Sequence, residues 1–411
     1  MKVLCVFGKY NYGDPKRGLG CEYVNFIPAL LHLGHEVLFL DSWDRTSFQD
    51  FTELNSALLR MVEQEHPDVV FAGLMHYEIW LETWEILRDA GITATVNWTT
   101  DDSWKYAPFS RLVAPAFHAF TTTYPDAHAR YQRDGILHVL LTQWAANAAS
   151  LQPPLPASEC QYPVSFVGTA HGKRRAWVNG LCRRGINVAC FGHGWPHGPV
   201  ASGDIPQIIR SSAISLNFAN SALAWDGVLP RQTNQIEART FEVSGAGGFL
   251  LTEWANGLDR CYTLRQEIAV FHTLDELADE IRYYLAHPAE RDAIAWAGYE
   301  RTRAEHTYDK RLAEVLGFAL RQREEYFVRL GMSPMDPFDW ARFEEVVQRH
   351  RMNQKLSLLK RTLVAACSVA WGPGRGPRAA RRLVFELSWR LAGAHTYSAA
   401  GWPGQMFYKV D

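Results

Sequence analysis

The chain has 411 residues, 47% of them hydrophobic and 21% charged, which excludes general disorder and allows large buried cores. At roughly 150 residues per domain, this length predicts two domains or three small ones. The formal net charge of −2 excludes a globally basic nucleic-acid-binding protein.

Cysteine usage and the hydrophobic runs indicate a cytoplasmic protein. The seven cysteines include no C-x-x-C pair, which favours buried thiols in a reducing compartment over a disulfide framework or a structural zinc site. Residues 1–8 are typical of a strand rather than of a signal peptide. No transmembrane helix is predicted, since the sequence has no run of about 18 apolar residues.

The first part of the chain alternates between predicted strands and helices, a pattern typical of a doubly wound parallel sheet. Compact apolar runs predict strands at residues 3–7, 36–40, 68–74, 94–98, 119–122 and 139–141. Apolar residues at helical spacing predict helices at residues 21–33, 54–65 and 79–90. The proline-rich stretch 151–163 predicts a linker, so we expect a first Rossmann-like domain over residues 1–155.

The same alternation then restarts and predicts a second Rossmann-like domain over residues 160–330. Its expected strands are residues 164–167, 187–191, 213–217, 248–252 and 268–271. Its expected helices are residues 174–184, 237–244, 274–286, 290–305 and 309–329. The fold class is therefore predicted as α/β with two successive doubly wound domains.

Residues 331–411 differ from both predicted domains and are expected to form a helical extension. Partly basic helices are predicted on either side of a turn-rich break at residues 371–377. Residues 351–411 hold ten Lys and Arg against two Asp and Glu, a net charge of +8, which leaves −10 for residues 1–350. Two interpretations stay open: the extension packs back on the acidic body, or it touches an anionic membrane surface.

Residues 164–175 are typical of a strand, a loop of small residues and the basic start of a helix. Lys173 and Arg174 are unfavourable at a helix N-terminus, where the dipole already presents positive charge, and a bound anion would relieve that conflict. Exposed amides beside a cation suit a diphosphate. The alternative is a pair of solvent-exposed basic residues beside a tight turn.

A second pattern lies in the predicted helix at residues 237–244. Arg239 and Glu242 are three residues apart, so they share one face of that helix. Spacing alone favours a helical salt bridge. A glutamate near a nucleotide can also accept two hydrogen bonds from a ribose diol.

These segments belong to a series of motifs whose order and spacing extend over about 150 residues. The motifs are Ser165-Phe166-Val167-Gly168-Thr169, Cys190-Phe191-Gly192, Ser215-Leu216-Asn217, Arg239-Thr240-Phe241-Glu242, Gly247-Gly248-Phe249-Leu250-Leu251-Thr252-Glu253, Glu276-Leu277, Ile281-Arg282-Tyr283-Tyr284-Leu285, Pro288, Glu290-Arg291 and His306-Thr307-Tyr308. In these motifs the chain resembles the C-terminal domain of the CgeB-like (spore maturation protein type) glycosyltransferases. This family is related to the family 4 retaining glycosyltransferases, so the resemblance implies a GT-B fold, in which two Rossmann-like domains face a cleft.

The resemblance implies that the second domain binds the diphosphate of a nucleotide-sugar donor. Gly168 and Thr169 would let the backbone approach the diphosphate, and Lys173 or Arg174 would neutralise it. Asn217, in the motif at the end of a predicted strand, is also expected to bind the donor.

The resemblance also implies contacts to the nucleoside and the sugar. Phe191 and Gly192 would border the base. Glu242 matches the second glutamate of the related enzymes' Glu-seven-residues-Glu motif and would hold the ribose. The first glutamate is replaced by Asn234, which departs from the pattern, and Arg239 is expected to contribute a diphosphate contact instead.

Ligands of parallel α/β sheets bind outside the carboxyl ends of the strands, which directs attention to three polar strand ends of the first domain. The first is the glycine-rich loop with Gly13, Gly18, Gly20 and Glu22, which is expected to approach donor or acceptor. A plain turn explains the glycines equally well.

The other two strand ends carry titratable side chains. His76 follows one strand, and a single histidine is more often structural than catalytic. Asp101 and Asp102 follow the next strand, where they either cap a helix or act as a base or acceptor-hydroxyl binder. Two close carboxylates can raise one pKa toward a useful value.

The resulting prediction is a cytoplasmic GT-B glycosyltransferase of the hexosyltransferase type. It would move a sugar from a nucleoside diphosphate donor to a hydroxyl acceptor, with retention and without a metal or other cofactor, and it would bind no nucleic acid. Peripheral contact with the inner face of the membrane through the basic extension stays open. The alternatives are a nucleotide-sugar epimerase of the same fold and a catalytically silent nucleotide-sugar-binding scaffold.

Overall fold

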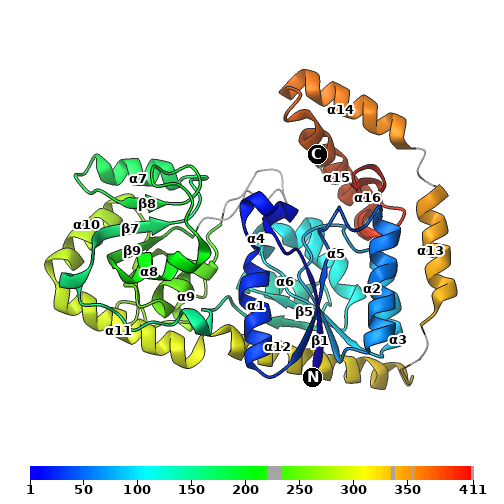
Figure 1. The fold of residues 1–411 in the computed structure, drawn as a ribbon, viewed down its shortest axis with the longest axis horizontal. Coiled ribbons are helices and arrows are strands. Elements are labelled where there is room, and N and C mark those ends of the chain that lie inside the picture. The colour runs from blue at the N-terminus through cyan, green and yellow to red at the C-terminus, as the bar shows by residue number, and fades with distance from the viewer. Residues whose placement is uncertain (220–232, 335–337, 353–355, 409–411) are drawn as a thin grey trace. The chain divides into compact units, whose positions relative to one another are not determined.

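The computed structural model describes residues 1–219, 233–334, 338–352 and 356–408. The chain divides into two units, each built on one parallel β-sheet with helices on both faces (Figure 1). Unit 1 comprises Met1–Thr122, Asp126–Leu141 and Ala313–Asp411. Unit 2 comprises Thr123–Pro125 and Thr142–Leu312.

Unit 1 contains six parallel strands in the order β2-β1-β3-β4-β5-β6. The strands are β1 (Lys2–Phe7), β2 (Glu36–Asp41), β3 (Val69–Ala72), β4 (Ala94–Asn97), β5 (Ala119–Thr122) and β6 (Val139–Leu141). The connecting helices are α1 (Cys21–His32), α2 (Phe51–Glu65), α3 (Leu81–Ala90), α4 (Asp102–Lys105), α5 (Arg111–Val113) and α6 (Pro125–Arg133). The strand order reverses between β1 and β3, which makes this the switch point of the sheet.

The local sequence explains these elements. Residues 3–7 of β1 are at most 1% exposed, because a parallel sheet covered by helices on both faces has no polar face. Helix α2 begins where the Asp50 side chain accepts the Glu53 N–H (3.0 Å), and it ends at His66 in the left-handed conformation. Capping residues therefore set the limits of the helix, and its apolar face sets how it packs.

Unit 2 contains five parallel strands in the order β11-β10-β9-β7-β8, so its order reverses between β7 and β9. The strands are β7 (Tyr162–Val167), β8 (Ala189–Phe191), β9 (Ser212–Asn217), β10 (Leu250–Glu253) and β11 (Ala269–Phe271). The helices are α7 (Arg174–Cys182), α8 (Ile205–Arg210), α9 (Ala238–Gly245), α10 (Leu274–Ala286) and α11 (Pro288–Glu305). The core contains apolar side chains from the central strands and from α10, among them Phe166, Leu216, Leu251 and Ile281.

The boundary of unit 2 differs from the linker predicted at residues 151–163. Ala146 forms a bridge with Thr307, and the Gln152 N–H donates to the Gly245 carbonyl (3.0 Å). These backbone contacts tie the segment before the prolines to unit 2, which begins at Thr142. The prolines therefore lie inside a unit rather than between two.

The chain returns to unit 1 after α11. Its last helices are α12 (Tyr308–Leu330), α13 (Trp340–Met352), α14 (Ser357–Trp371), α15 (Gly376–Ala392) and α16 (Trp402–Met406). The Tyr397 hydroxyl donates to the Pro108 carbonyl, and the Ala399 N–H donates to Glu82 (3.1 Å). The predicted extension at residues 331–411 thus has contacts with the first sheet's own helices, as the packing interpretation expects.

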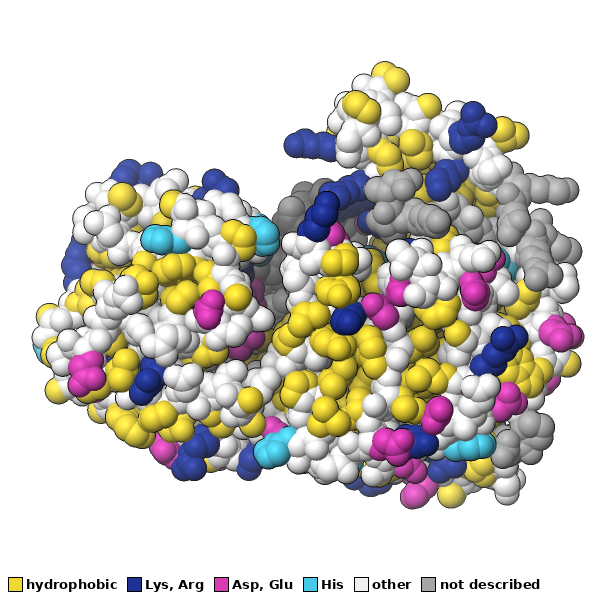
Figure 2. Space-filling model, viewed as in Figure 1, with side chains coloured by type: hydrophobic (Ala, Val, Ile, Leu, Met, Phe, Trp, Pro, Cys, Tyr) yellow, Lys and Arg dark blue, Asp and Glu magenta, His cyan; other side chains and the backbone are white. Residues whose placement is uncertain are grey.

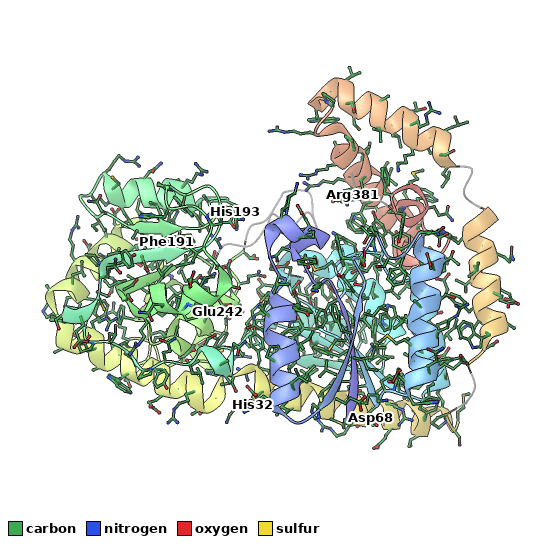
Figure 3. All side chains as sticks on the ribbon, viewed as in Figure 1. His32, Asp68, Phe191, His193, Glu242 and Arg381 are labelled. Atoms are coloured by element: carbon green, nitrogen blue, oxygen red, sulfur yellow. The ribbon has the colours of Figure 1, made fainter. Side chains whose placement is uncertain are left out.

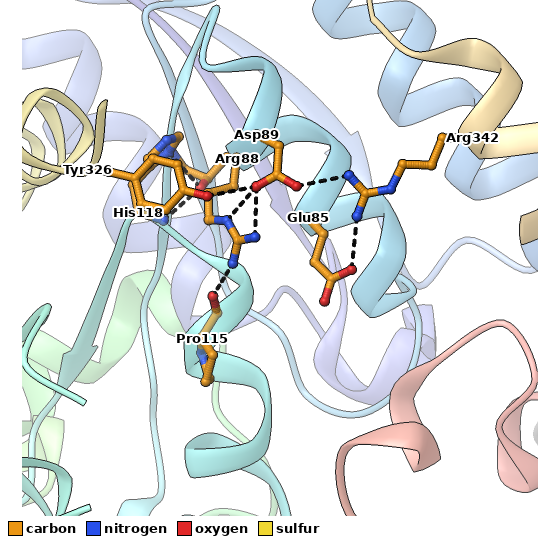
Figure 4. Close-up of polar contacts among 8 residues, drawn as sticks. Glu85, Arg88, Asp89, Pro115, His118, Tyr326 and Arg342 are labelled. Atoms are coloured by element: carbon orange, nitrogen blue, oxygen red, sulfur yellow. Dashed lines mark hydrogen bonds and ion pairs between the residues drawn. The ribbon is translucent and has the colours of Figure 1, made fainter. Parts of the chain in front are cut away.

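A partly buried polar network attaches α12 and α13 to α3 (Figure 4). Asp89 accepts hydrogen bonds from the Tyr326 hydroxyl (2.8 Å), from Arg342 (2.8 Å) and from Arg88 (2.7 Å). Arg342 also reaches Glu85 at 3.2 Å. Burial acts to raise the pKa of Asp89, but hydrogen bonds from Arg342 and Arg88 prevail and hold it below its usual value.

Candidate functional site

The strand order of each sheet shows where a ligand would bind. Ligands of doubly wound sheets bind at the carboxyl ends of the strands beside the switch point. In unit 1 these strands are β1 and β3, which lead into residues 8–20 and 73–78. In unit 2 they are β7 and β9, and β7 leads into residues 168–173. Most of the predicted site residues lie in or near these segments.

In unit 2, the loop after β7 packs closely against the loop after β8. The Gly168 N–H donates to the Phe191 carbonyl (2.8 Å), and the Trp195 indole N–H donates to the Gly168 carbonyl (2.8 Å). Gly192 has a φ of +123°, and a Cβ atom there would lie 2.3 Å from the Gly168 carbonyl oxygen. The Phe191 ring is buried and lies 4.6 Å from the His197 ring, centroid to centroid. Only glycine at position 192 permits this approach of the two loops.

Lys173 and Arg174, at the start of α7, are both paired with carboxylates of the protein. Lys173 Nζ lies 2.5 Å from the buried carboxylate of Glu253. One terminal nitrogen of Arg174 lies 3.1 Å from both carboxylate oxygens of Glu237, and the other donates to the Thr169 carbonyl (3.3 Å). These glutamates offset the positive charge at the helix N-terminus without a bound anion. The interpretation of the two as solvent-exposed basic residues is wrong for Arg174, which is 6% exposed.

Arg239 and Glu242 on α9 form the ion pair that their spacing predicts, with Nε and Oε2 3.3 Å apart. Their side chains are 20% and 29% exposed, and Figure 3 labels Glu242 in unit 2. Nη1 of Arg239 is buried and has no hydrogen-bond partner among the described residues. A guanidinium with an unused donor beside a partly exposed carboxylate can bind an anionic group and a hydroxyl group together.

Asn217 and Asn234, which belong to the predicted donor site, hold neighbouring segments of unit 2 together. The Asn217 amide donates to the hydroxyl oxygens of Thr252 (3.1 Å) and Thr240 (3.4 Å), which joins the end of β9 to β10 and α9. The Asn234 amide donates to the Trp254 carbonyl (2.8 Å). Asn234 therefore lies beside the end of β10, where it fixes the segment that leads into α9.

In unit 1, the predicted glycine loop forms a compact turn between β1 and α1. The Asn11 amide donates to the carbonyls of Arg17 (3.2 Å) and Leu19 (2.9 Å), and the Gly20 N–H donates to the Lys9 carbonyl (2.8 Å). This hydrogen bonding fixes the shape of the loop.

Two of the loop's glycines adopt positive φ. These are Gly13 at +69°, which packs on the Trp43 side chain, and Gly18 at +78°, which has open space around it. The turn therefore accounts for both glycines by backbone conformation alone. Glu22 follows in the first turn of α1, so its carboxylate faces the positive end of the helix dipole.

The charges of Lys105 and Asp101 both act on Glu22, and we call these three residues the Lys105 cluster. Burial raises the pKa of the Glu22 carboxyl above its usual value, while the Lys105 charge opposes that rise and the Asp101 charge adds to it. Lys105 is 3% exposed, and its ammonium donates a long hydrogen bond of 3.4 Å to the Met75 carbonyl. The ammonium also lies over the rings of Trp104 (5.3 Å) and Phe109 (6.0 Å), which offset part of the cost of burying its charge, and a polar ligand would add a further partner.

Asp102 lies in the interior of unit 1, in contrast to its neighbour. It is 1% exposed and accepts a hydrogen bond from the Tyr131 hydroxyl (3.1 Å). Burial raises its pKa to about 6, and hydrogen bonds from Ser110, Thr122 and Tyr131 oppose that rise. The Lys105 charge also opposes that rise. The two adjacent acids therefore differ in burial, with Asp101 the more exposed of the two.

The His76 ring packs against aromatic side chains. Its centroid lies 6.1 Å from the Trp43 ring and 6.0 Å from the Phe385 ring of α15. Burial, followed by the charges of Lys105 and Arg381, lowers the pKa of His76 to about 3, and Figure 3 labels Arg381 on α15. Such a weakly basic imidazole is neutral near pH 7 and is a poor general base.

Sequence reasoning missed Lys105, although it follows Asp101 by four residues and so shares a helix face with it. It also assigned no role to Glu253, the partner of Lys173. Across the described residues, no group of three His, Cys, Asp or Glu side chains could hold a metal ion. None of the helices in the described parts of the chain is long and apolar enough to cross a membrane.

Comparisons with known proteins agree with this architecture. Residues 173–317 match a family model described as glycosyl transferase-like. The fold is similar to that of Anabaena HepE in complex with UDP, with 11% identity, a TM-score of 0.53, and coverage of 77% of this chain and 100% of that chain. No curated protein sequence matches the chain.

Two further solved structures share the fold. Sucrose-phosphate synthase from Thermosynechococcus elongatus has 12% identity and a TM-score of 0.52, over 81% of this chain and 100% of that chain. A glycosyltransferase from Rickettsia africae has 11% identity and a TM-score of 0.52, over 79% and 97%. The predicted fold class, two Rossmann-like units as in GT-B glycosyltransferases, is confirmed.

Proposed function

We propose that this chain is a glycosyltransferase that moves a sugar from a nucleoside diphosphate donor, held by unit 2, to a hydroxyl acceptor, held by unit 1. The observation that carries the proposal is the match of residues 173–317 to the glycosyl transferase-like model. This segment includes the Arg239–Glu242 pair and most of the second sheet. The UDP bound by Anabaena HepE supports a nucleoside diphosphate as the donor's leaving group.

On the donor side, Arg239 and Glu242 have complementary roles. The partly exposed Glu242 carboxylate accepts hydrogen bonds from the two ribose hydroxyls. The partly exposed Arg239 guanidinium contributes positive charge to the diphosphate, where negative charge grows as the bond to the sugar breaks. Lys173 and Arg174 contribute positive potential at the start of α7, although their glutamate partners reduce it.

On the acceptor side, the Lys105 cluster binds the hydroxyl groups. The carboxylates of Glu22 and Asp101 accept hydrogen bonds from these groups, and the Lys105 ammonium donates one. A retaining reaction needs no strong base on this side, so the cluster acts by orientation. We extend the proposal to retention, metal independence, a hexosyl donor and the CgeB-like subtype, all of which rest on the family resemblance.

Replacing Glu242 by Gln tests the donor site. We expect the affinity for the nucleoside diphosphate, measured by calorimetry, to fall by about tenfold to a hundredfold, because a charge-assisted hydrogen bond contributes about 1.5–3 kcal/mol. Glu300→Gln is the matched control, because Glu300 forms an ion pair with Arg303 at the same three-residue spacing on α11. This control should bind like the unmodified chain.

A panel of nucleotide-sugars, with and without hydroxyl acceptors, tests the reaction class. Transfer with retained anomeric configuration, read by NMR of the product and undiminished by a chelator, is the expected result. Epimerised donor formed without an acceptor would replace the proposal with an epimerase. Binding without turnover across the panel would indicate a scaffold, and no saturable binding of any nucleoside diphosphate would exclude the whole class.

A further inference from the structure

Helix α14 is apolar on two opposite sides. Its inner side packs on α15 and α16, where Leu363, Val364 and Cys367 meet Ala380 and Val384 in a small core. Its outer side is exposed and carries a second set of apolar residues. These residues, which we call the α14 outer face, are Leu358, Leu359, Ala365, Ala366, Val369 and Ala370, and the exposed Trp371 follows them as the last residue of the helix.

The exposure of this face is large for apolar side chains. Leu358 is 72% exposed, Val369 is 90% exposed and Trp371, at the turn into α15, is 60% exposed. Single exposed apolar residues are ordinary, but a contiguous row along a helix marks an interaction site. The inner side already accounts for how α14 is held to α15, so the outer face needs another partner.

The segment that contains the α14 outer face is strongly basic. The described residues 356–408 hold seven Lys and Arg and one acidic residue, Glu386. Glu386 forms an ion pair with Arg390, so this pair adds no net charge. The seven basic residues are Lys360, Arg361, Arg375, Arg378, Arg381, Arg382 and Arg390. In the view of Figure 2, basic and hydrophobic side chains gather over this part of unit 1.

We propose that the α14 outer face docks unit 1 onto an anionic lipid bilayer surface. An amphipathic helix with apolar side chains flanked by Lys and Arg lies in the headgroup region, where the chains enter the acyl boundary and the cations meet lipid phosphates. A tryptophan at the end of the helix suits the interface, which accommodates an apolar ring with a polar N–H. A second copy of the chain fits less well, because two strongly positive surfaces would repel each other.

Helix α15, on which α14 packs, is fixed to the candidate acceptor side of unit 1. Phe385 of α15 packs on His76, after the end of β3, and Tyr397 bonds to the Pro108 carbonyl. A bilayer that holds α14 would therefore hold the carboxyl edge of the first sheet near lipid headgroups. The docking surface does not rest on the proposed transferase reaction, and its test uses no activity.

Vesicle co-sedimentation of the full chain tests the proposal. We expect binding to phosphatidylcholine vesicles that contain phosphatidylglycerol, weak binding to phosphatidylcholine alone, and loss of binding as salt is raised. The double variant Val369→Glu with Trp371→Glu should lower the vesicle partition coefficient by more than about tenfold. Val328→Glu is the matched control, because Val328 is a similarly exposed valine on α12, at 81%.

A second variant separates charge from apolar contact. Replacing Arg361, Arg378 and Arg382 by Gln should remove the preference for anionic lipid, and all variants should unfold at the same temperature because these positions are exposed. Equal binding to both vesicle types, or full binding by the double glutamate variant, would overturn the proposal. Absence of vesicle binding together with dimers that the glutamate variant dissociates would assign the face to self-association instead.

Discussion

At the scale of single residues, the Lys105 ammonium is the most informative feature of unit 1. It is buried, yet its hydrogen bond to Met75 is 3.4 Å long, and it influences the titration of Glu22, His76 and Asp102. A charge held in this way is stabilised further when a ligand supplies a hydroxyl oxygen. This supports the proposal that the acceptor binds at the Lys105 cluster.

Lys105→Met tests this role, because methionine keeps the length of the side chain and removes its charge. We expect kcat/KM for the acceptor to fall by about tenfold to a hundredfold, the effect of losing one charged hydrogen bond of about 1.5–3 kcal/mol. Nucleoside diphosphate affinity should not change. The control is Lys310→Met, at an exposed position. Unchanged acceptor kinetics in the Lys105 variant, or an equal loss in the control, would refute the assignment.

The residue scale also shows what could be predicted from the sequence and what could not. The Arg239–Glu242 pair was predictable, because a three-residue helix spacing is a local signal. The ion pair of Arg174 with Glu237 was not, since 63 residues separate the partners. Asp101 and Asp102 look alike in sequence, and only the fold shows that Asp102 is buried.

At the scale of elements, the parallel strands were predictable because burial on both faces produces uninterrupted apolar runs. All eleven expected strands overlap the observed ones, with limits that differ by few residues. The α14 outer face was not predictable, because a helix that is apolar on two sides gives no periodic signal for which side is covered. Only the contacts of Leu363 and Val364 with the α15 and α16 core identify the inner side.

The attachment of α13 to α3 provides a test at this scale, through Asp89. Its pKa in the folded state lies below the ordinary 3.8, so the ionised carboxylate stabilises the fold above about pH 4. That contribution is lost as the pH falls through the lowered folded-state pKa. Asp89→Asn should therefore reduce the free energy of unfolding at neutral pH by about 1–2 kcal/mol and flatten its decline in acid.

Urea denaturation across this pH range measures the effect. Asp279→Asn is the control, because Asp279 is exposed and forms an ion pair with Arg282 three residues away. Exposed pairs of this kind contribute little, so the control should follow the unmodified chain. An Asp89 variant with unaltered stability at neutral pH would show that the network in Figure 4 does not hold α13 in place.

At the scale of the whole molecule, the uneven distribution of charge gains a structural explanation. Residues 351–411 carry a net charge of +8 while the rest of the chain carries −10. Much of the positive charge lies on α14 and α15. The near-neutral total therefore conceals a strongly basic segment, part of which packs on unit 1 through Tyr397 and Ala399, while the proposed lipid contact concerns α14.

The two units have separate sheets and separate cores, so we expect the full chain to unfold in two thermal transitions. If unit 2 alone holds the donor, UDP should raise the midpoint of one transition and leave the other in place. At a ligand concentration of about 100 times Kd, the stabilisation is about 2.7 kcal/mol, enough to resolve by calorimetry. The Glu242→Gln variant should lose most of this shift while keeping both transitions. A UDP shift shared equally by both transitions would contradict donor binding by unit 2 alone.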